Sequence, residues 1–142
     1  MPNIQTGGIY RIGSPADPTI PAALILVTAV DDTTQSASVT LLSPDVALGT
    51  SDDLLLTSEH SGLRYPLLVE ADIFGYVGFH QVWRYFGRIQ PSVLAALDAL
   101  RNDDAVDSVI AGPPLTNRTD PRWAFKLSEL RRMQALSTYP YL

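Results

Sequence analysis

One apolar run, from Ala22 to Val30, constrains the fold of this 142-residue chain more than any other feature. It is too short to cross a bilayer and too continuous to lie on a protein surface, which is typical of a strand buried on both faces. Pro21 precedes the run, and a polar turn from Asp31 to Thr34 follows it. We therefore predict a central strand over Leu24 to Val30, paired in an antiparallel hairpin with the next segment, Ser36 to Leu42.

The rest of the first hundred residues indicates further short strands and one helix. We expect strands at 7–12, 53–57, 65–70 and 79–84, with a polar loop at 58–62. Gly75 and Gly78 predict a turn or bulge between them and Asp72, so that the last two strands form a hairpin. Pro91 to Arg101 should be a helix, because Pro lies in its first turn and apolar residues share one face.

A second amphipathic helix is predicted at the C-terminal end, from Pro121 to Leu136. Its apolar stripe, Trp123, Leu127, Leu130 and Met133 or Gln134, should dock on the body or on a partner. Arg131 and Arg132 should face acidic residues. The expected organisation is a β-barrel body over 1–112, then a linker and a basic amphipathic helix over 113–142. Strands at short spacing followed by helices predict a mostly β fold, a small antiparallel barrel or bent sheet with C-terminal helices.

Composition narrows the functional classes. The chain has no Cys and two His, so we expect no thiolate site, no His-rich metal site and no cofactor. Neither a signal peptide nor a membrane-spanning run is visible in the sequence, which predicts a cytoplasmic protein without a membrane partner.

Charge is unevenly distributed along the chain. The net charge of −5 divides into −8 over residues 1–112 and +3 over residues 113–142. An acidic body is a poor general nucleic-acid binder, because contacts to phosphate dominate that affinity. The basic end is suited to nucleic acid, to a partner, or to the chain's own acidic body.

The residues around His60 form the first candidate catalytic group. His60 shares its polar segment with Thr57, Ser58 and Arg64. An imidazole can move a proton of a hydroxyl, and a guanidinium can stabilise the charge that develops on a phosphoryl group. The alternative interpretation is a surface loop with an incidental histidine. His80, on the predicted strand 79–84, is a second candidate for the proton transfer, or a structural residue of that strand.

Basic and aromatic residues alternate just after His80. Arg84 and Arg88 flank Tyr85 and Phe86, and Arg11 supplies another cation from the first predicted strand. Such interleaving suits single-stranded RNA, which binds through base stacking and phosphate contacts. An ordinary amphipathic strand produces the same pattern.

Four groups of residues follow one another in a suggestive order. They are Gly7-Gly8-Ile9-Tyr10, then Pro21-Ala22 with Leu24 to Thr28, then Thr57-Ser58 before Tyr65-Pro66-Leu67, then His80-Gln81-Val82 before Gly87-Arg88-Ile89. Their order and spacing resemble the MazF/PemK family of plasmid-maintenance and growth-inhibitor toxins, from Gly7 to about Leu100. The resemblance implies an SH3-like barrel of the MazF/PemK/CcdB type, a homodimer, and a metal-independent endoribonuclease neutralised by an antitoxin. It also places Gln81 among the substrate-binding residues.

The chain departs from that family's pattern at two functional positions. Ile20 stands where the resemblance implies a catalytic arginine, and His80 stands where it implies a strand aspartate. Two functional hypotheses follow. The first is a toxin-family endoribonuclease for single-stranded RNA, in which Thr57 or Ser58 positions the phosphate, His60 or His80 moves the proton, and Arg64 or Arg84 stabilises charge. The second is an inactive barrel of this type that acts as a protein-binding or regulatory module.

Overall fold

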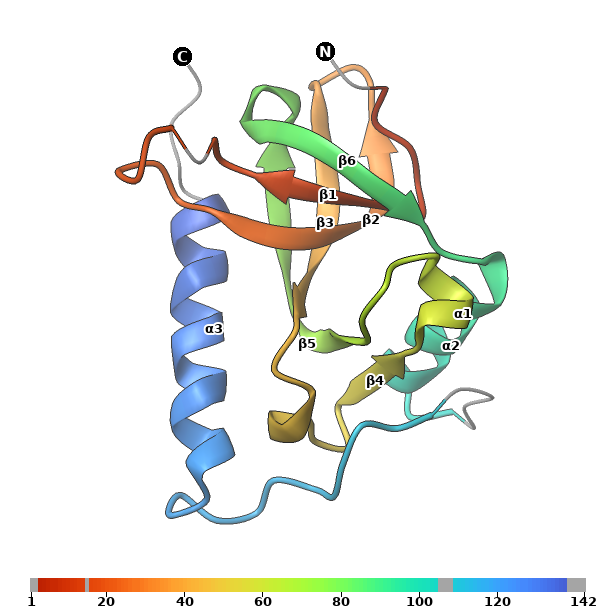
Figure 1. The fold of residues 1–142 in the computed structure, drawn as a ribbon, viewed down its shortest axis with the longest axis vertical. Helices are drawn as coiled ribbons and strands as arrows, with labels where there is room; N and C mark the ends of the chain where they lie inside the picture. The colour runs from red at the N-terminus through yellow and green to blue at the C-terminus, as the bar shows by residue number, and fades with distance from the viewer. Residues whose placement is uncertain (1–2, 15, 105–108, 138–142) are drawn as a thin grey trace.

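The computed structural model describes residues 3–14, 16–104 and 109–137, and it is built on a six-stranded antiparallel sheet. The strands lie in the order β4-β5-β3-β2-β1-β6 (Figure 1). They are β1 (Gly8–Ile12), β2 (Ala23–Asp31), β3 (Ser36–Ser43), β4 (Asp53–Leu56), β5 (Leu67–Gly78) and β6 (Val82–Arg88). The α-helices are α1 (Ser58–Ser61), α2 (Pro91–Arg101) and α3 (Pro121–Ser137), and two 3-10 turns are η1 (Val46–Leu48) and η2 (Phe79–Gln81).

Strand β2 is the centre of this sheet, as the apolar run predicts. It pairs with β1 on one side and with β3 on the other, where Val27 faces Val39 and Leu24 faces Leu42. Neighbouring residues of a strand point to opposite faces. Ile25 and Leu26 accordingly belong to two different hydrophobic clusters, one on each face of the bent sheet. The predicted central strand and its hairpin partner are therefore confirmed.

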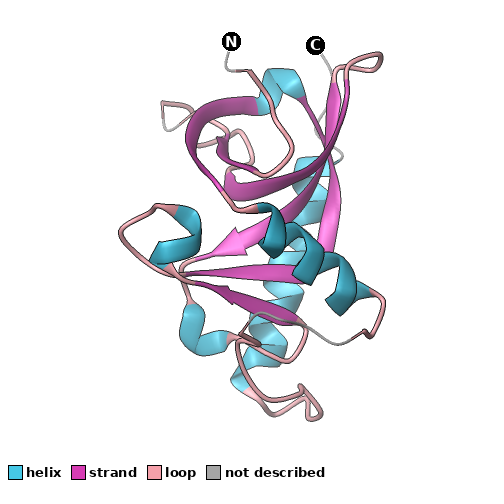
Figure 2. Ribbon diagram, turned by 90° about the vertical axis from the view of Figure 1, so that its right-hand side faces the viewer, coloured by secondary structure: helices cyan, strands magenta, loops and turns pink. Residues whose placement is uncertain are grey.

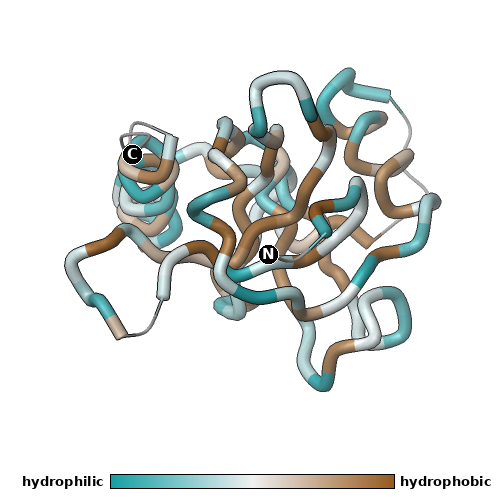
Figure 3. The backbone as a smooth tube through the Cα atoms, turned by 90° about the horizontal axis from the view of Figure 1, so that it is seen from above, coloured by the Kyte–Doolittle hydropathy of each residue, from teal (hydrophilic) through white to brown (hydrophobic). Residues whose placement is uncertain are grey.

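A helix covers each of the two clusters. Helix α2 contributes Val93, Ala96 and Leu97 to the cluster that contains Leu26, and α3 contributes Met133 and Leu136 to the cluster that contains Ile25. Figure 2 shows the sheet between the helices, and Figure 3 shows the hydrophobic stretches gathered along the strands. Since α3 lies on the opposite side of the molecule from α1 and α2 in Figure 1, it leaves the region of α1 uncovered.

The predicted hairpin between residues 65–70 and 79–84 is wrong. Strand β5 continues without a turn to Gly78, where η2 redirects the chain, and β6 pairs with β1 instead. The irregularity expected within β5 is a register shift opposite Thr40 and Leu41 of β3. Arg101 makes this shift tolerable, because its Nε donates to the Ala71 carbonyl (2.8 Å) and its terminal nitrogen donates to the Thr40 hydroxyl (2.5 Å).

Gly75 allows close packing of a helix and does not form the predicted turn. A Cβ atom at this position would lie 2.9 Å from the Met133 sulfur and would also collide with the side chain of Ser137. The absent side chain thus allows α3 to approach β5 closely. The Ser137 hydroxyl also accepts a hydrogen bond from the Tyr76 N–H (3.2 Å).

The sheet is bent in the manner of a barrel but does not close, so β4 and β6 are its edges. The outer edge of β4 is partly covered by the segment 109–111. There the Leu55 N–H donates to the Val109 carbonyl, and the Ala111 N–H donates to the Asp53 carbonyl, both at 2.9 Å. Within the described residues β6 pairs with β1 alone, so its other edge faces outward. No helix among the described residues is long and apolar enough to span a membrane.

Helix α3 docks on the body, but through a different face from the predicted one. Leu127 and Leu130 remain 42% and 44% exposed, whereas Glu129, Met133 and Leu136 are buried. The predicted docking stripe is therefore wrong for Leu127 and Leu130, whereas Met133 is buried as that stripe requires. The reason lies in the surface beneath the helix, which carries fully buried Asp53 and Glu70 and so requires charged or protonated partners rather than leucines.

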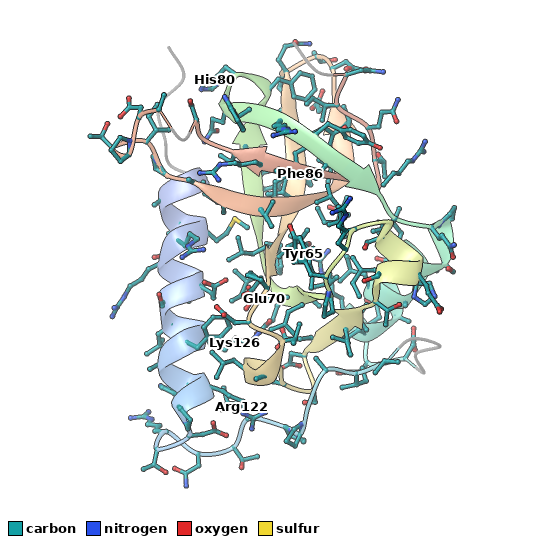
Figure 4. All side chains as sticks on the ribbon, in the orientation of Figure 1. Tyr65, Glu70, His80, Phe86, Arg122 and Lys126 are labelled. Atoms are coloured by element: carbon teal, nitrogen blue, oxygen red, sulfur yellow. The ribbon has the colours of Figure 1, made fainter. Side chains whose placement is uncertain are left out.

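Lys126 is the cation that meets those carboxylates. Its Nζ forms an ion pair with Asp53 and lies 3.1 Å from Asp72 and 3.5 Å from Glu70. Asp53 also accepts hydrogen bonds from the backbone N–H and the hydroxyl of Thr50. Figure 4 shows Lys126 of α3 directed toward Glu70 of β5. One lysine thus joins three acidic residues of the body to the C-terminal helix.

Glu70 and Glu129 form a second contact between β5 and α3. Both side chains are buried, and neither oxygen of Glu70 receives a hydrogen bond from an N–H or hydroxyl donor of the described residues. Burial, followed by the hydrogen bond to Glu129 and the charge of that residue, raises the pKa of Glu70 to about 9. A carboxyl group with this pKa is mostly protonated at neutral pH.

This buried proton makes stability depend on pH. The pKa of Glu70 is about 9 in the folded chain and about 4.5 in the unfolded chain, so folding takes up a proton between these values. The stabilisation is fully present below about pH 4.5 and is lost as pH rises towards 9, by up to about 1.4 kcal/mol per pH unit. We expect Glu70→Gln to flatten the unfolding free energy between about pH 5 and 9, and to raise it at the alkaline end.

Urea unfolding at several pH values measures this effect. Glu59→Gln, at an exposed position of α1, is the matched control and should keep the wild-type slope. An unaltered slope in Glu70→Gln would show that the proton is bound elsewhere.

Candidate functional site

The segment predicted as a polar loop is a single helical turn, α1, that brings two candidate residues together. The Thr57 carbonyl accepts the backbone N–H groups of His60 (3.1 Å) and Ser61 (3.2 Å). Gly62 ends the turn with a φ of 75°, a left-handed conformation that favours glycine. As a result, the Thr57 hydroxyl and the Nδ1 atom of His60 are hydrogen-bonded at 2.8 Å. Ser58, on the same turn, is exposed.

A pocket of about 370 Å³ lies between α1, β4 and α2. Thr57, His60 and Ser92 provide its polar groups, and leucine, valine and alanine side chains form most of the rest of its lining. None of the described residues that line it is Arg or Lys. The pocket therefore has a hydroxyl–imidazole pair but no cation of its own. Ser92 was missed in the sequence, although its place in the first turn of α2 was a usable signal.

Basic and aromatic side chains gather on β1 and β6. Arg11 and Arg84 are direct partners across the two strands. The Arg11 guanidinium lies 6.0 Å from the centre of the Trp83 ring, and that of Arg84 lies 5.5 Å from the Phe86 ring. Trp83 and Tyr85 are 42% and 49% exposed. This edge therefore offers stacking surfaces and cations side by side, the combination that binds single-stranded nucleic acid.

The end of β6 adjoins the segment that follows α1. A Cβ atom at Gly87 would lie 3.2 Å from the Ser61 carbonyl oxygen and 3.8 Å from the Leu63 side chain. Exposed Arg64 and Tyr65 come next in this segment, and Arg88 ends β6. Tyr65 and Phe86, labelled in Figure 4, mark the two sides of this junction. The end of the basic strand β6 thus lies next to the segment that follows the Thr57–His60 pair.

His80 does not belong to this group. It lies on η2 rather than on a strand, and η2 precedes β6, whereas the α1 junction meets the end of β6. Seven strand residues separate the two places, which corresponds to about 23 Å at 3.3 Å per residue. Figure 4 shows His80 at the top of the molecule, far from the junction. His60 and His80 are therefore alternatives and cannot act on one phosphate together.

Gln81 is a structural residue, contrary to the expectation that it binds substrate. Its side chain is buried, accepts the Gly78 N–H (2.8 Å) and donates to the Leu136 carbonyl (3.0 Å). It thereby fixes η2 and attaches the end of α3. Ile20, where the family resemblance implies arginine, is a half-buried apolar residue of the loop before β2 and offers no charge.

Comparison with solved structures defines the fold class: the chain has the fold of an endoribonuclease that pairs with an antitoxin. It matches "Endoribonuclease in complex with its cognate antitoxin from Mycobacterial species" with a TM-score of 0.53 and 16% identity, over 72% of this chain and 93% of that one. The Mycobacterium tuberculosis toxin MazF-mt6 matches with a TM-score of 0.49 and 15% identity, over 69% and 98% of the two chains. No family model and no curated protein sequence matches the chain. The mostly β fold with C-terminal helices that the sequence predicts is thus confirmed, and this chain shares it with a solved endoribonuclease.

The role of Gln81 can be tested by its removal. Gln81→Leu should leave the Gly78 N–H and the Leu136 carbonyl buried without partners, at a cost of about 1–3 kcal/mol for each group. Chemical denaturation measures the loss. Gln90→Leu, the same change at an exposed position before α2, should change stability little and serves as the control. A wild-type unfolding free energy in Gln81→Leu would contradict the structural role.

Proposed function

We propose that this chain is a toxin-family endoribonuclease that cleaves single-stranded RNA at the junction of β6 and α1. The observation that carries the proposal is the run of exposed arginine and aromatic side chains on β6, with half-buried Arg11 beside it on β1. This run leads toward the hydrogen-bonded Thr57–His60 pair. The fold shared with an endoribonuclease supports the same class of activity. RNA would lie along β6, with bases on Trp83 and Tyr85 and phosphates near Arg84 and Arg88.

The proposed reaction is an internal transfer at phosphorus. The ribose 2′-oxygen forms a bond to the adjacent phosphorus, and the bond from phosphorus to the 5′-oxygen breaks. His60 accepts the proton of the 2′-hydroxyl, and a proton returns to the departing 5′-oxygen, so the reaction consumes no further reagent. The Thr57 hydroxyl holds the imidazole through Nδ1 and leaves Nε2 for this transfer. Ser58 is the alternative hydroxyl for positioning the phosphate.

Because Ile20 stands where the family resemblance implies a catalytic arginine, another residue must supply the positive charge. Arg64, in the segment after α1, is our first choice for stabilising the charge on the phosphoryl oxygens, and Arg84 is the second. A protein of this class would act in the cytoplasm as a homodimer. It would also be neutralised by an antitoxin, because the solved endoribonuclease that shares its fold is in complex with its cognate antitoxin.

One observation favours a second function. The pocket beside His60 is mostly apolar and contains no arginine or lysine among its described lining residues. Such a pocket suits the side chain of a protein partner better than a phosphate. An inactive barrel that binds a protein is therefore the alternative. Expression of the chain alone in a bacterium separates the two, because only the nuclease should stop growth with fragmented RNA.

Substitution of the proposed proton acceptor and cation tests the first function directly. We expect His60→Ala and Arg64→Ala each to lower cleavage of a fluorescent single-stranded RNA by about a hundredfold or more. The matched control is Arg131→Ala, which removes an exposed arginine side chain of α3. This variant should cleave the RNA normally. Undiminished cleavage in both site variants, with a loss in His80→Ala, would move the site to η2.

Binding to the β1–β6 edge has its own test. Trp83→Ala should weaken binding of a single-stranded oligonucleotide by about 1–3 kcal/mol, the range for loss of one stacked base. Arg84→Ala should weaken binding more at low salt and lower the salt dependence by about one counterion. Fluorescence anisotropy at several salt concentrations measures both effects. Tyr76→Ala, an exposed aromatic on β5, is the control, and an equal loss there would argue against a specific edge.

A further inference from the structure

Helix α3 leaves apolar side chains exposed, because it docks on the body partly through charged residues. Lys126 and Glu129 face the body, whereas Leu127 and Leu130 are more than two-fifths exposed. A hollow of about 180 Å³ lies beside these leucines, and Trp123 lines it together with them. An exposed hollow of this character suits an apolar side chain of another molecule.

A second hollow, of about 350 Å³, adjoins the first. Asp52 and Asp72 line both hollows, so they form an acidic ridge between them. Asp103 adds a third carboxylate to the second hollow, and Phe74 adds a ring that is 62% exposed. Carboxylates beside an exposed aromatic ring attract the side chain of a lysine or an arginine.

The negative charge of this ridge is not balanced within the described residues. The Lys126 ammonium is already shared among three carboxylates, of which only Asp72 belongs to the ridge. Arg101 lines the second hollow, but its nitrogens donate to a backbone carbonyl and a hydroxyl. Neither Asp52 nor Asp103 forms an ion pair with a lysine or arginine of the described residues. Burial, followed by the negative charge of Asp72, raises the pKa of Asp52, so a nearby cation would relieve this repulsion.

The sign of the charge determines which kind of molecule suits this surface. Nucleic acids bind mainly through their phosphates, which carboxylates repel. An anionic membrane surface attracts basic segments and repels acidic ones. Apolar hollows flanked by carboxylates are instead complementary to an amphipathic protein segment, in which leucine-like side chains alternate with lysine or arginine.

We propose that the acidic ridge and its two hollows bind a cationic amphipathic segment of a partner protein. An apolar side chain of the segment enters the hollow beside Leu127 and Leu130, and its basic side chains pair with Asp52 and Asp103. Since α3 lies on the opposite side of the molecule from α1 in Figure 1, this contact leaves the pocket beside α1 open. The contact is independent of RNA cleavage.

Fluorescence anisotropy with a labelled synthetic peptide tests this contact on the full chain. The probe is a helical peptide of about five turns, with leucine at the i, i+3 and i+4 positions of each turn and lysine elsewhere. The wild-type protein should bind it about tenfold more tightly than a peptide with alanine in place of each leucine, and less tightly as salt is added. A version with glutamate in place of lysine should not bind. Equal affinity for the leucine and alanine peptides, or no binding of the lysine peptide, would overturn the proposal.

Substitution of the exposed leucines locates the apolar part of the contact. Leu127→Ser/Leu130→Ser should weaken peptide binding by about tenfold with an unaltered circular dichroism spectrum. Val109→Ser, which shortens a 56% exposed side chain beside β4, is the matched control and should bind like the wild type. Sedimentation velocity of the protein alone accompanies these measurements. If the wild type self-associates through the same leucines, the occupant is a second copy and the proposal is wrong.

Substitution of the aspartates locates the charged part. Asp52→Asn/Asp103→Asn should weaken peptide binding by about tenfold at low salt, because it removes two unpaired carboxylates. Asp31→Asn/Asp32→Asn removes the same formal charge at the end of β2 and should bind normally. An equal loss in the two double variants would show that the peptide is attracted only by the overall negative charge, and would contradict a defined contact at the ridge.

Discussion

The attachment of α3 depends on carboxyl groups that the body cannot satisfy alone. Asp53 of the edge strand β4 and Glu70 of the adjacent strand β5 are fully buried, and α3 covers them. Lys126 pairs with Asp53, and burial beside Glu129 raises the pKa of Glu70 to about 9. A buried carboxylate without such partners is costly, so the helix and the surface beneath it are interdependent. The other contacts of α3, through Met133 and Leu136, provide the apolar part of the attachment.

The features that the sequence predicted well are those set by apolar pattern and by backbone chemistry. The run Ala22 to Val30 is central, because its side chains fill the clusters on both faces. What failed depended on long-range partners. Alternation in residues 79–84 gave no sign that β6 pairs with β1, and Gly75 looked like a turn residue because the approach of Met133 is invisible in the sequence. The face of α3 was misjudged for the same reason, since the buried acids lie more than fifty residues away in the chain.

The sequence indicated which residues to group in the candidate site better than it indicated how those residues are arranged. Thr57, His60 and Arg64 were grouped by their spacing, and α1 does join the first two. The sequence could not separate His60 from His80, or show that Gln81 is held by Gly78 and Leu136. Because residue 20 is isoleucine and not the arginine that the family resemblance implies, the proposed activity depends on a positive charge from another segment of the chain. The proposed chemistry accordingly lies at the end of β6, which adjoins the segment after α1 that contains Arg64.

The glycine on β5 has a consequence for comparing this chain with others of the same fold. A side chain at Gly75 would displace α3 and strip the cover from Glu70 and Asp53. In a chain without such a helix, those two acids would have no reason to persist, and apolar residues would serve better there. Glycine at position 75, acids at 53 and 70, and lysine at 126 should therefore be gained and lost together. That joint pattern would separate, within a group of divergent sequences, the molecules with a docked C-terminal helix from those with the bare sheet.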